Sequence, residues 1–92
     1  MPDNLVVFYS LRAGEPEADV AKAIRSLGEA IPVGPSLWYV ASSWLAGEAA
    51  ERIRTGMGAA SALLVVNAST DSLAWFNLDY GDEIQQLWFE AD

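Results

Sequence analysis

Asn4-Leu-Val-Val-Phe-Tyr-Ser-Leu11 is the stretch that decides the fold of this chain. Every residue from Leu5 to Tyr9 is leucine, β-branched or aromatic, and polar residues or Gly- and Pro-containing segments lie on both sides. A short unbroken apolar run of this kind is typical of a central strand that is buried on both faces. We therefore expect a buried strand here, and its end at Tyr9-Ser10 is the first place to look for chemistry.

Composition bounds the class of protein. The chain has 92 residues, of which 52% are hydrophobic and 11% aromatic. That is enough for one folded domain with a core and too little for two. The sequence contains no cysteine and no histidine. It therefore has no disulfide, no thiolate zinc site and no cysteine nucleophile, and it lacks the commonest general base near neutral pH.

The charge is acidic and unevenly placed. Thirteen acidic side chains stand against five basic ones, a net charge of −8, and no basic residue follows Arg54. Nucleic-acid binding depends on Lys and Arg side chains that neutralise phosphates, so we do not expect a nucleic-acid partner. The plain interpretation of the acidity is solubility. The alternative is an acidic face that meets a basic partner protein or mimics nucleic acid.

No segment predicts a membrane span or a secretion signal. Apolar runs stay well below the roughly 20 residues that cross a bilayer. The first four residues carry no basic side chain, and the run Leu5–Leu11 is too short for a signal core. We expect a cytoplasmic protein without a membrane partner.

Hydrophobic periodicity predicts two helices in the first two thirds of the chain. Residues 17–28 place Val20, Ile24 and Leu27 along one side of a helix. A second helix is expected to begin at a cap formed by Ser42-Ser43 and to end at Gly56. Between the two helices, residues 30–33 and 36–42 predict a hairpin whose first strand Pro32 confines to a sheet edge or a bulge.

The last third predicts one strand and a short helix. Ser61–Ala68 is a second continuous apolar run, suited to the interior of a sheet. Residues 73–78 fit either a short edge strand or an irregular segment. Residues 82–90 predict a C-terminal helix that opens with Asp82 in a capping box, and a strand that extends a partner's sheet is the alternative.

The order strand, helix, strand, strand, helix, strand predicts an α+β, ferredoxin-like fold. Its four-stranded antiparallel sheet carries two helices on one face, and we expect the two unbroken apolar runs to be the inner strands. Residues 1–92 form one domain, with residues 4–68 as its core and residues 69–92 as an extension. Because the helices cover one face only, we expect the extension or a second copy to cover the other, and we predict a homodimer. The predicted interface residues are Tyr9, Trp75, Phe76, Trp88 and Phe89.

Local sequences along this order resemble a known family. The stretches are Val6-Val-Phe-Tyr-Ser-Leu11, the helix end Ser26-Leu-Gly28, Pro35-Ser-Leu-Trp-Tyr-Val40 and Ser61-Ala-Leu-Leu-Val-Val66. Together they resemble the small SinR-like proteins, which are related to the small subunit of the CRISPR adaptation machinery and to the VapD-type ribonucleases. The resemblance covers roughly residues 4–78. It implies a ferredoxin-like protomer that dimerises by bringing sheets together.

The same resemblance bears on catalysis. In nuclease members of this group an Asp follows a Tyr at the end of the first strand, and the two copies bind a divalent metal across the dimer axis. In this chain that position reads Tyr9-Ser10. A neutral hydroxyl is a poor ligand for Mg²⁺, which prefers carboxylates. The chain thus resembles the family in pattern and departs from it at the residue that would carry the chemistry.

Other candidate chemistry has a simpler explanation in each case. Ser10 as a nucleophile lacks a histidine base, and Lys22 is the only lysine for a Ser–Lys scheme. Asp79, Asp82 and Glu83 lie close together, but their spacing matches no EF-hand loop, so helix-cap and surface roles are expected.

Three hypotheses follow. The leading one is a non-catalytic, homodimeric protein-interaction module with no cofactor. The second is a divalent-metal-dependent endoribonuclease that uses Mg²⁺, with Ser10, Asp79 and Asp82 as weak candidates. The third is an acidic inhibitor or nucleic-acid mimic that binds a basic partner protein.

Overall fold

The computed structural model of the chain describes residues 3–12, 14, 17–57, 61–68, 74 and 80–90. These residues form four strands and three helices in the predicted order. The elements are β1 (Asp3–Ser10), α1 (Glu17–Arg25), β2 (Gly28–Gly34), β3 (Leu37–Ser42), α2 (Ala46–Arg54), β4 (Ala62–Asn67) and α3 (Gly81–Glu90). The predicted ferredoxin-like α+β fold is confirmed, and so is the C-terminal helix.

The sheet has the strand order β2-β3-β1-β4, and every pairing is antiparallel. The inner strands are therefore β1 and β3. The prediction that Ser61–Ala68 supplies an inner strand is wrong, because β4 pairs with β1 alone and lies at an edge. The apolar residues of β4 lie in two different environments. Leu63 and Val65 pack against the core, whereas Leu64 and Val66 are exposed on the opposite face.

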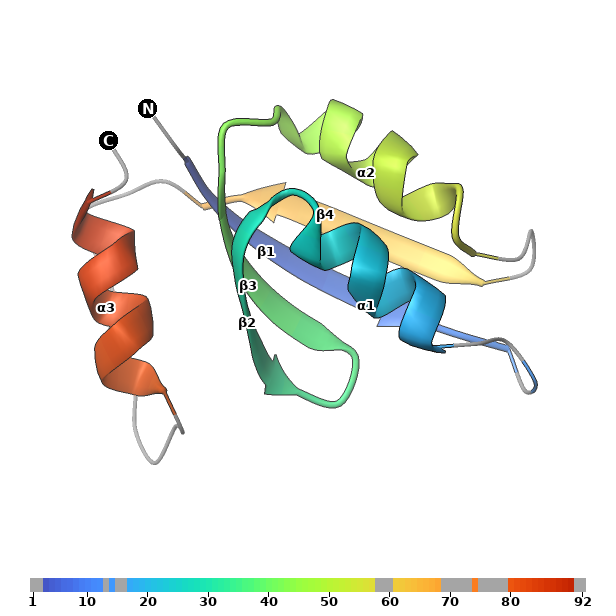
Figure 1. Cartoon of the computed structure of the whole chain (residues 1–92), viewed down its shortest axis with the longest axis horizontal. Coiled ribbons are helices and arrows are strands. Elements are labelled where there is room, and N and C mark those ends of the chain that lie inside the picture. The colour runs from blue at the N-terminus through green and yellow to red at the C-terminus, as the bar shows by residue number, and fades with distance from the viewer. Residues whose placement is uncertain are drawn as a thin grey trace.

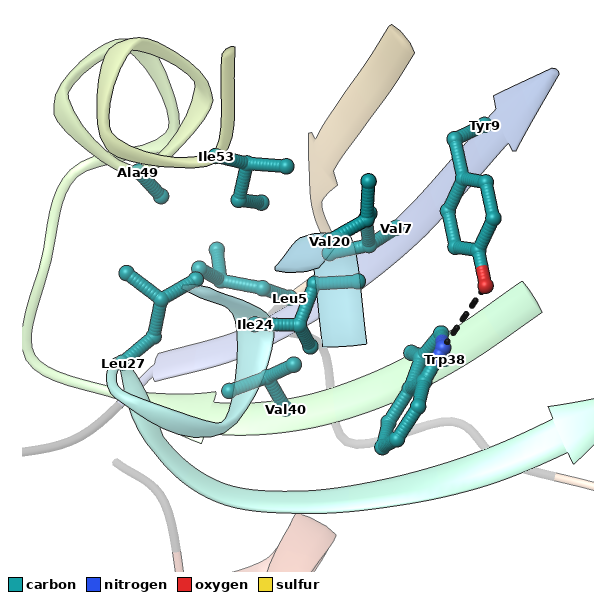
Figure 2. Packing of buried hydrophobic residues seen from close by; sticks show 10 residues of the cluster. All are labelled: Leu5, Val7, Tyr9, Val20, Ile24, Leu27, Trp38, Val40, Ala49 and Ile53. Carbon is teal, nitrogen blue, oxygen red and sulfur yellow. Dashed lines mark hydrogen bonds between the residues drawn. The ribbon is translucent and has the colours of Figure 1, made fainter. Parts of the chain in front are cut away.

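The main core lies between the sheet and the pair α1 and α2 (Figure 2). Alternate residues of β1 point into it, since successive side chains of a strand face opposite sides. The predicted stripe of α1 is confirmed, because its apolar residues meet those of the sheet there. The buried residues of this main core are Leu5, Val7, Tyr9, Val20, Ile24, Leu27, Trp38, Val40, Ala49 and Ile53. Each large aliphatic side chain fully buried in this way contributes about 1.5–3 kcal/mol.

The ends of the elements follow the local sequence signals at some positions and depart from them at others. Pro32 lies in an edge strand beside a register shift between Pro32 and Gly34, as predicted. The cap of α2 is Leu45 and not the serine pair. Ser42 Oγ instead accepts a hydrogen bond of 3.0 Å from the Trp44 N–H. Helix α3 begins at Gly81, so Asp82 lies in its first turn and does not cap it.

The third helix lies on the other side of the sheet. Figure 1 shows α3 apart from α1 and α2, next to the β2–β3 side of the sheet. Tyr39 and Ala41 of β3 form a second cluster with Ile84 and Trp88 of α3. Within the described part of the chain, no helix is long and apolar enough to cross a membrane. The segment 73–78, left open between strand and irregular structure, lies outside the described residues except for residue 74.

Candidate functional site

Among the residues that the structure describes, α3 covers only part of the width of the sheet face that turns away from α1 and α2. On the β2–β3 side, α3 packs against Tyr39 and Ala41; we call this region the covered half. On the β1–β4 side the same face carries Val6, Phe8, Leu64 and Val66, which we call the open half.

The open half is apolar and accessible. In the sheet register Val6 stands opposite Val66, and Phe8 stands opposite Leu64. Directly opposed residues of an antiparallel pair share one face, so these four side chains form a continuous patch. Phe8 is 44% exposed, Leu64 57% and Val66 40%. Large apolar side chains that cluster on a surface in this way mark an interaction site more often than single exposed residues do.

An apolar hollow adjoins the open half at the end of β1. It has a volume of about 220 Å³ and is lined by residues 8–10 of β1 and 62–64 of β4. The hollow includes Ser10, which is exposed and pairs with Ala62 across the strands. Its lining residues include no carboxylate and no amine, so the hollow suits packing and not acid–base chemistry.

The covered half is held by a buried amide. Asn4 is fully buried, and its Nδ2 donates a 3.1 Å hydrogen bond to the backbone carbonyl of Trp88. Its Oδ1 accepts a 2.6 Å hydrogen bond from the Tyr39 hydroxyl. The rings of Tyr39 and Trp88 stack with centroids 5.9 Å apart and planes 27° from parallel. Sequence reasoning missed Asn4, whose only signal was a polar residue at the start of an apolar run.

Tyr9 belongs to the main core. Its hydroxyl donates a 2.6 Å hydrogen bond to Glu17 Oε2. The same hydroxyl accepts a hydrogen bond of 3.5 Å from Trp38 Nε1, which Figure 2 shows. Burial raises the pKa of Tyr9, and the neighbouring Glu17 carboxylate raises it further. The guanidinium of Arg25 lies 4.8 Å from the centre of the Trp38 ring. These contacts tie α1 to the sheet and bury most of the Tyr9 side chain within this chain, and an interface role for it stays a prediction.

The other predicted interface residues fall into three groups. Trp88 is 8% exposed and is buried in the covered half, so its ring also packs within this chain. Phe89, the next residue, is 51% exposed, and an interface role for it stays a prediction. Trp75 and Phe76 lie outside the described residues.

The candidate catalytic residues do not come together in the described part of the chain. Ser10 lies at the end of β1 and Asp82 is exposed on α3, and no hydrogen bond joins them. Lys22 lies on α1, on the far side of the sheet from Ser10, because Ser10 alternates with the core residue Tyr9. Asp79 lies outside the described residues. Among the residues described, no three acidic, histidine or cysteine side chains are grouped to hold a metal ion.

A scan against protein-family models finds no family that matches this chain, and searches of curated proteins and of solved structures find no match either. Function is therefore inferred from the surface geometry of the chain.

Proposed function

We propose that this chain is a non-catalytic protein-interaction module that acts as a homodimer, with the open half of its sheet at the contact. The observation that carries the proposal is the exposure of Phe8, Leu64 and Val66 side by side on one face. Removing such apolar surface from water is favourable by roughly 25 cal/mol per Å². A second copy supplies an equally apolar surface, as a symmetric interface requires.

Charge supports the choice of this surface for self-association. Each copy carries a net charge of −8, so two copies repel wherever their acidic groups approach. The open half has no charged side chain, and neither does any residue of β4. This surface therefore lets two acidic chains meet without bringing like charges into direct contact.

The sequence resemblance agrees with this proposal. The SinR-like proteins it points to are expected to dimerise through their sheets, and the nuclease members need an acidic residue where this chain has Ser10. With a neutral hydroxyl there, we propose that the association is kept and the metal-dependent cleavage is absent.

The test is the molar mass in solution, measured by light scattering or sedimentation over a range of protein concentrations. We expect a dimer for the natural sequence and a monomer for Leu64→Asp, which places a carboxylate in the open half. Leu45→Asp is the matched control, because Leu45 is 62% exposed but lies at the start of α2. A natural chain that stays monomeric at every concentration contradicts the proposal.

The proposal that the chain is non-catalytic is tested by a separate cleavage assay. RNA is incubated with the protein and Mg²⁺ or Mn²⁺, and we expect no cleavage above a buffer control. Cleavage that is lost both in EDTA and in Asp82→Asn would establish the endoribonuclease alternative instead.

A further inference from the structure

We propose that two copies join edge to edge, with β4 of one protomer paired antiparallel to β4 of its partner, so that the two sheets become one continuous sheet. This inference rests on the proposed homodimer and specifies how its second copy docks.

The two edges of the sheet differ in the features that prevent edge pairing. Natural edge strands are protected by charges, prolines and bulges, which hinder the addition of another strand. The β2 edge has all three: Glu29, Pro32 and the register shift between Pro32 and Gly34. The β4 edge has none, because its six residues read Ala-Leu-Leu-Val-Val-Asn and keep an unbroken register with β1.

The backbone of β4 shows which groups are available for pairing. The Ala68 N–H donates a 2.8 Å hydrogen bond to the Asn4 carbonyl, so Ala68 points its backbone toward β1. Because hydrogen-bonding direction alternates along an antiparallel strand, Val66 and Leu64 also point toward β1. The N–H and C=O groups of Leu63 and Val65 therefore point away from the sheet. Within the described part of the chain, no strand pairs with that outer edge.

A second copy of β4 satisfies these groups by symmetry. An antiparallel strand paired with itself is related by a two-fold axis, which is the commonest symmetry of protein dimers. Outward-pointing residues must pair with each other, and the two registers that overlap most of β4 place Val65 opposite either Val65 or Leu63 of the second copy. In the first register Leu64 lies opposite Val66 of the other copy, and in the second it lies opposite Leu64. Either register places exposed apolar side chains of the two open halves next to each other.

The absence of cysteine makes this geometry directly testable, since any disulfide must form between introduced residues. The variants Leu64→Cys and the double variant Leu64→Cys, Val66→Cys are oxidised mildly and run on a non-reducing gel. Directly opposed positions on paired strands have Cβ atoms about 4.5–5.5 Å apart, close to disulfide distance. If Leu64 lies opposite Leu64 of the second copy, we expect most of the Leu64→Cys protein to cross-link as a dimer. If Leu64 lies opposite Val66, we expect cross-linked dimer only in the double variant.

Two control variants test the alternative contacts, which are pairing through the β2 edge and stacking of the two sheets. Glu29→Cys, on the β2 edge, is expected to give only a trace of cross-linked dimer. Phe8→Cys is expected to give none, because edge pairing separates the two β1 strands by three strand spacings, roughly 14 Å. Cross-linking at Phe8→Cys without cross-linking at residues 64 and 66 overturns edge pairing in favour of stacked sheets, and the homodimer itself stands. Equal cross-linking at Glu29→Cys also overturns it.

Amide hydrogen exchange supplies a second readout that needs no substitution. In the edge-paired dimer the Leu63 and Val65 amides are protected at high protein concentration and lose protection on dilution. Exchange that stays fast at concentrations where the mass is dimeric overturns the edge pairing alone. Protection that does not change with concentration, in a chain that is monomeric, means that the chain covers its own edge, and it overturns both proposals.

Discussion

The covered half and the open half belong to the same face of one sheet, and they are completed in different ways. In the covered half Tyr39 is 3% exposed and Trp88 is 8% exposed, whereas Phe8 and Leu64 of the open half are 44% and 57% exposed. Both halves are apolar, so hydrophobicity alone does not decide which of them α3 covers. The difference is Asn4, a polar group at the β1–β3 side that α3 satisfies through its backbone. The comparison teaches that a directional hydrogen bond, added to apolar contacts, distinguishes the covered half from the open half of the same face.

The largest effect is expected from Trp88→Ala. This change removes the ring that stacks on Tyr39 and leaves a cavity in the covered half, so we expect the free energy of unfolding to fall by about 3–5 kcal/mol. Urea denaturation at a fixed protein concentration and constant oligomeric mass measures it. Phe89→Ala is the control, and we expect a change within about 0.5 kcal/mol because that ring is half exposed. Equal losses in the two variants would mean that α3 does not close the covered half.

Asn4→Ala comes next. It removes the 2.6 Å acceptor of the buried Tyr39 hydroxyl and the donor to the Trp88 carbonyl, and we expect the free energy of unfolding to fall by about 1–3 kcal/mol. A double-mutant cycle with Tyr39→Phe isolates the pair, and we expect a coupling energy of at least about 0.5 kcal/mol. Additive losses would show that the hydrogen bond does not link the two residues energetically.

Tyr9→Phe is expected to give a smaller effect, and it extends the comparison to the face covered by α1 and α2. The loss of the hydrogen bonds to Glu17 and Trp38 acts at every pH, and the diagnostic part of the effect appears at alkaline pH. The pKa of Tyr9 is raised in the folded chain by burial and by Glu17, so folding favours the protonated phenol. The stabilisation is fully present below the ordinary pKa of about 10 and is lost as pH rises through the higher folded value. We expect unfolding free energy to fall less steeply above pH 10 in the variant than in the natural chain. Parallel curves from denaturation at a series of pH values would contradict this.

The smallest effect on the fold is expected from Leu64→Thr in the open half. Threonine suits a strand, and the leucine side chain is mostly exposed, so the protomer should lose about 1 kcal/mol or less. Denaturation is compared with the natural chain at a dilution where both are monomers. A loss as large as that of Trp88→Ala would show that the open half is buried within its own chain.

The order of elements could be predicted because its signals are local. Val20, Ile24 and Leu27 recur at helical spacing, and Pro32 fixes an edge through its missing donor. The position of β4 could not be predicted from its apolar run. A strand buried on both faces and an edge strand with one face left open carry the same residues, and only pairing distinguishes them.

The covered half was beyond sequence reasoning for a similar reason. The hydrogen bond from Asn4 to Trp88 joins residues 84 positions apart, and no spacing rule connects them. Trp38 and Trp88 both lie in apolar stretches of the sequence, but they pack on different faces of the sheet. Trp38 packs in the main core under α1, and Trp88 packs on the opposite face of the sheet.

Asn4 also limits how α3 can sit on the sheet. Apolar contacts such as those of Ile84 and Trp88 tolerate sliding, because dispersion and hydrophobic forces have little directionality. A buried amide tolerates sliding less, since a shift of α3 by one residue would move the Trp88 carbonyl away from Asn4 Nδ2 and break the hydrogen bond between them. Placements of α3 that break this hydrogen bond are therefore disfavoured.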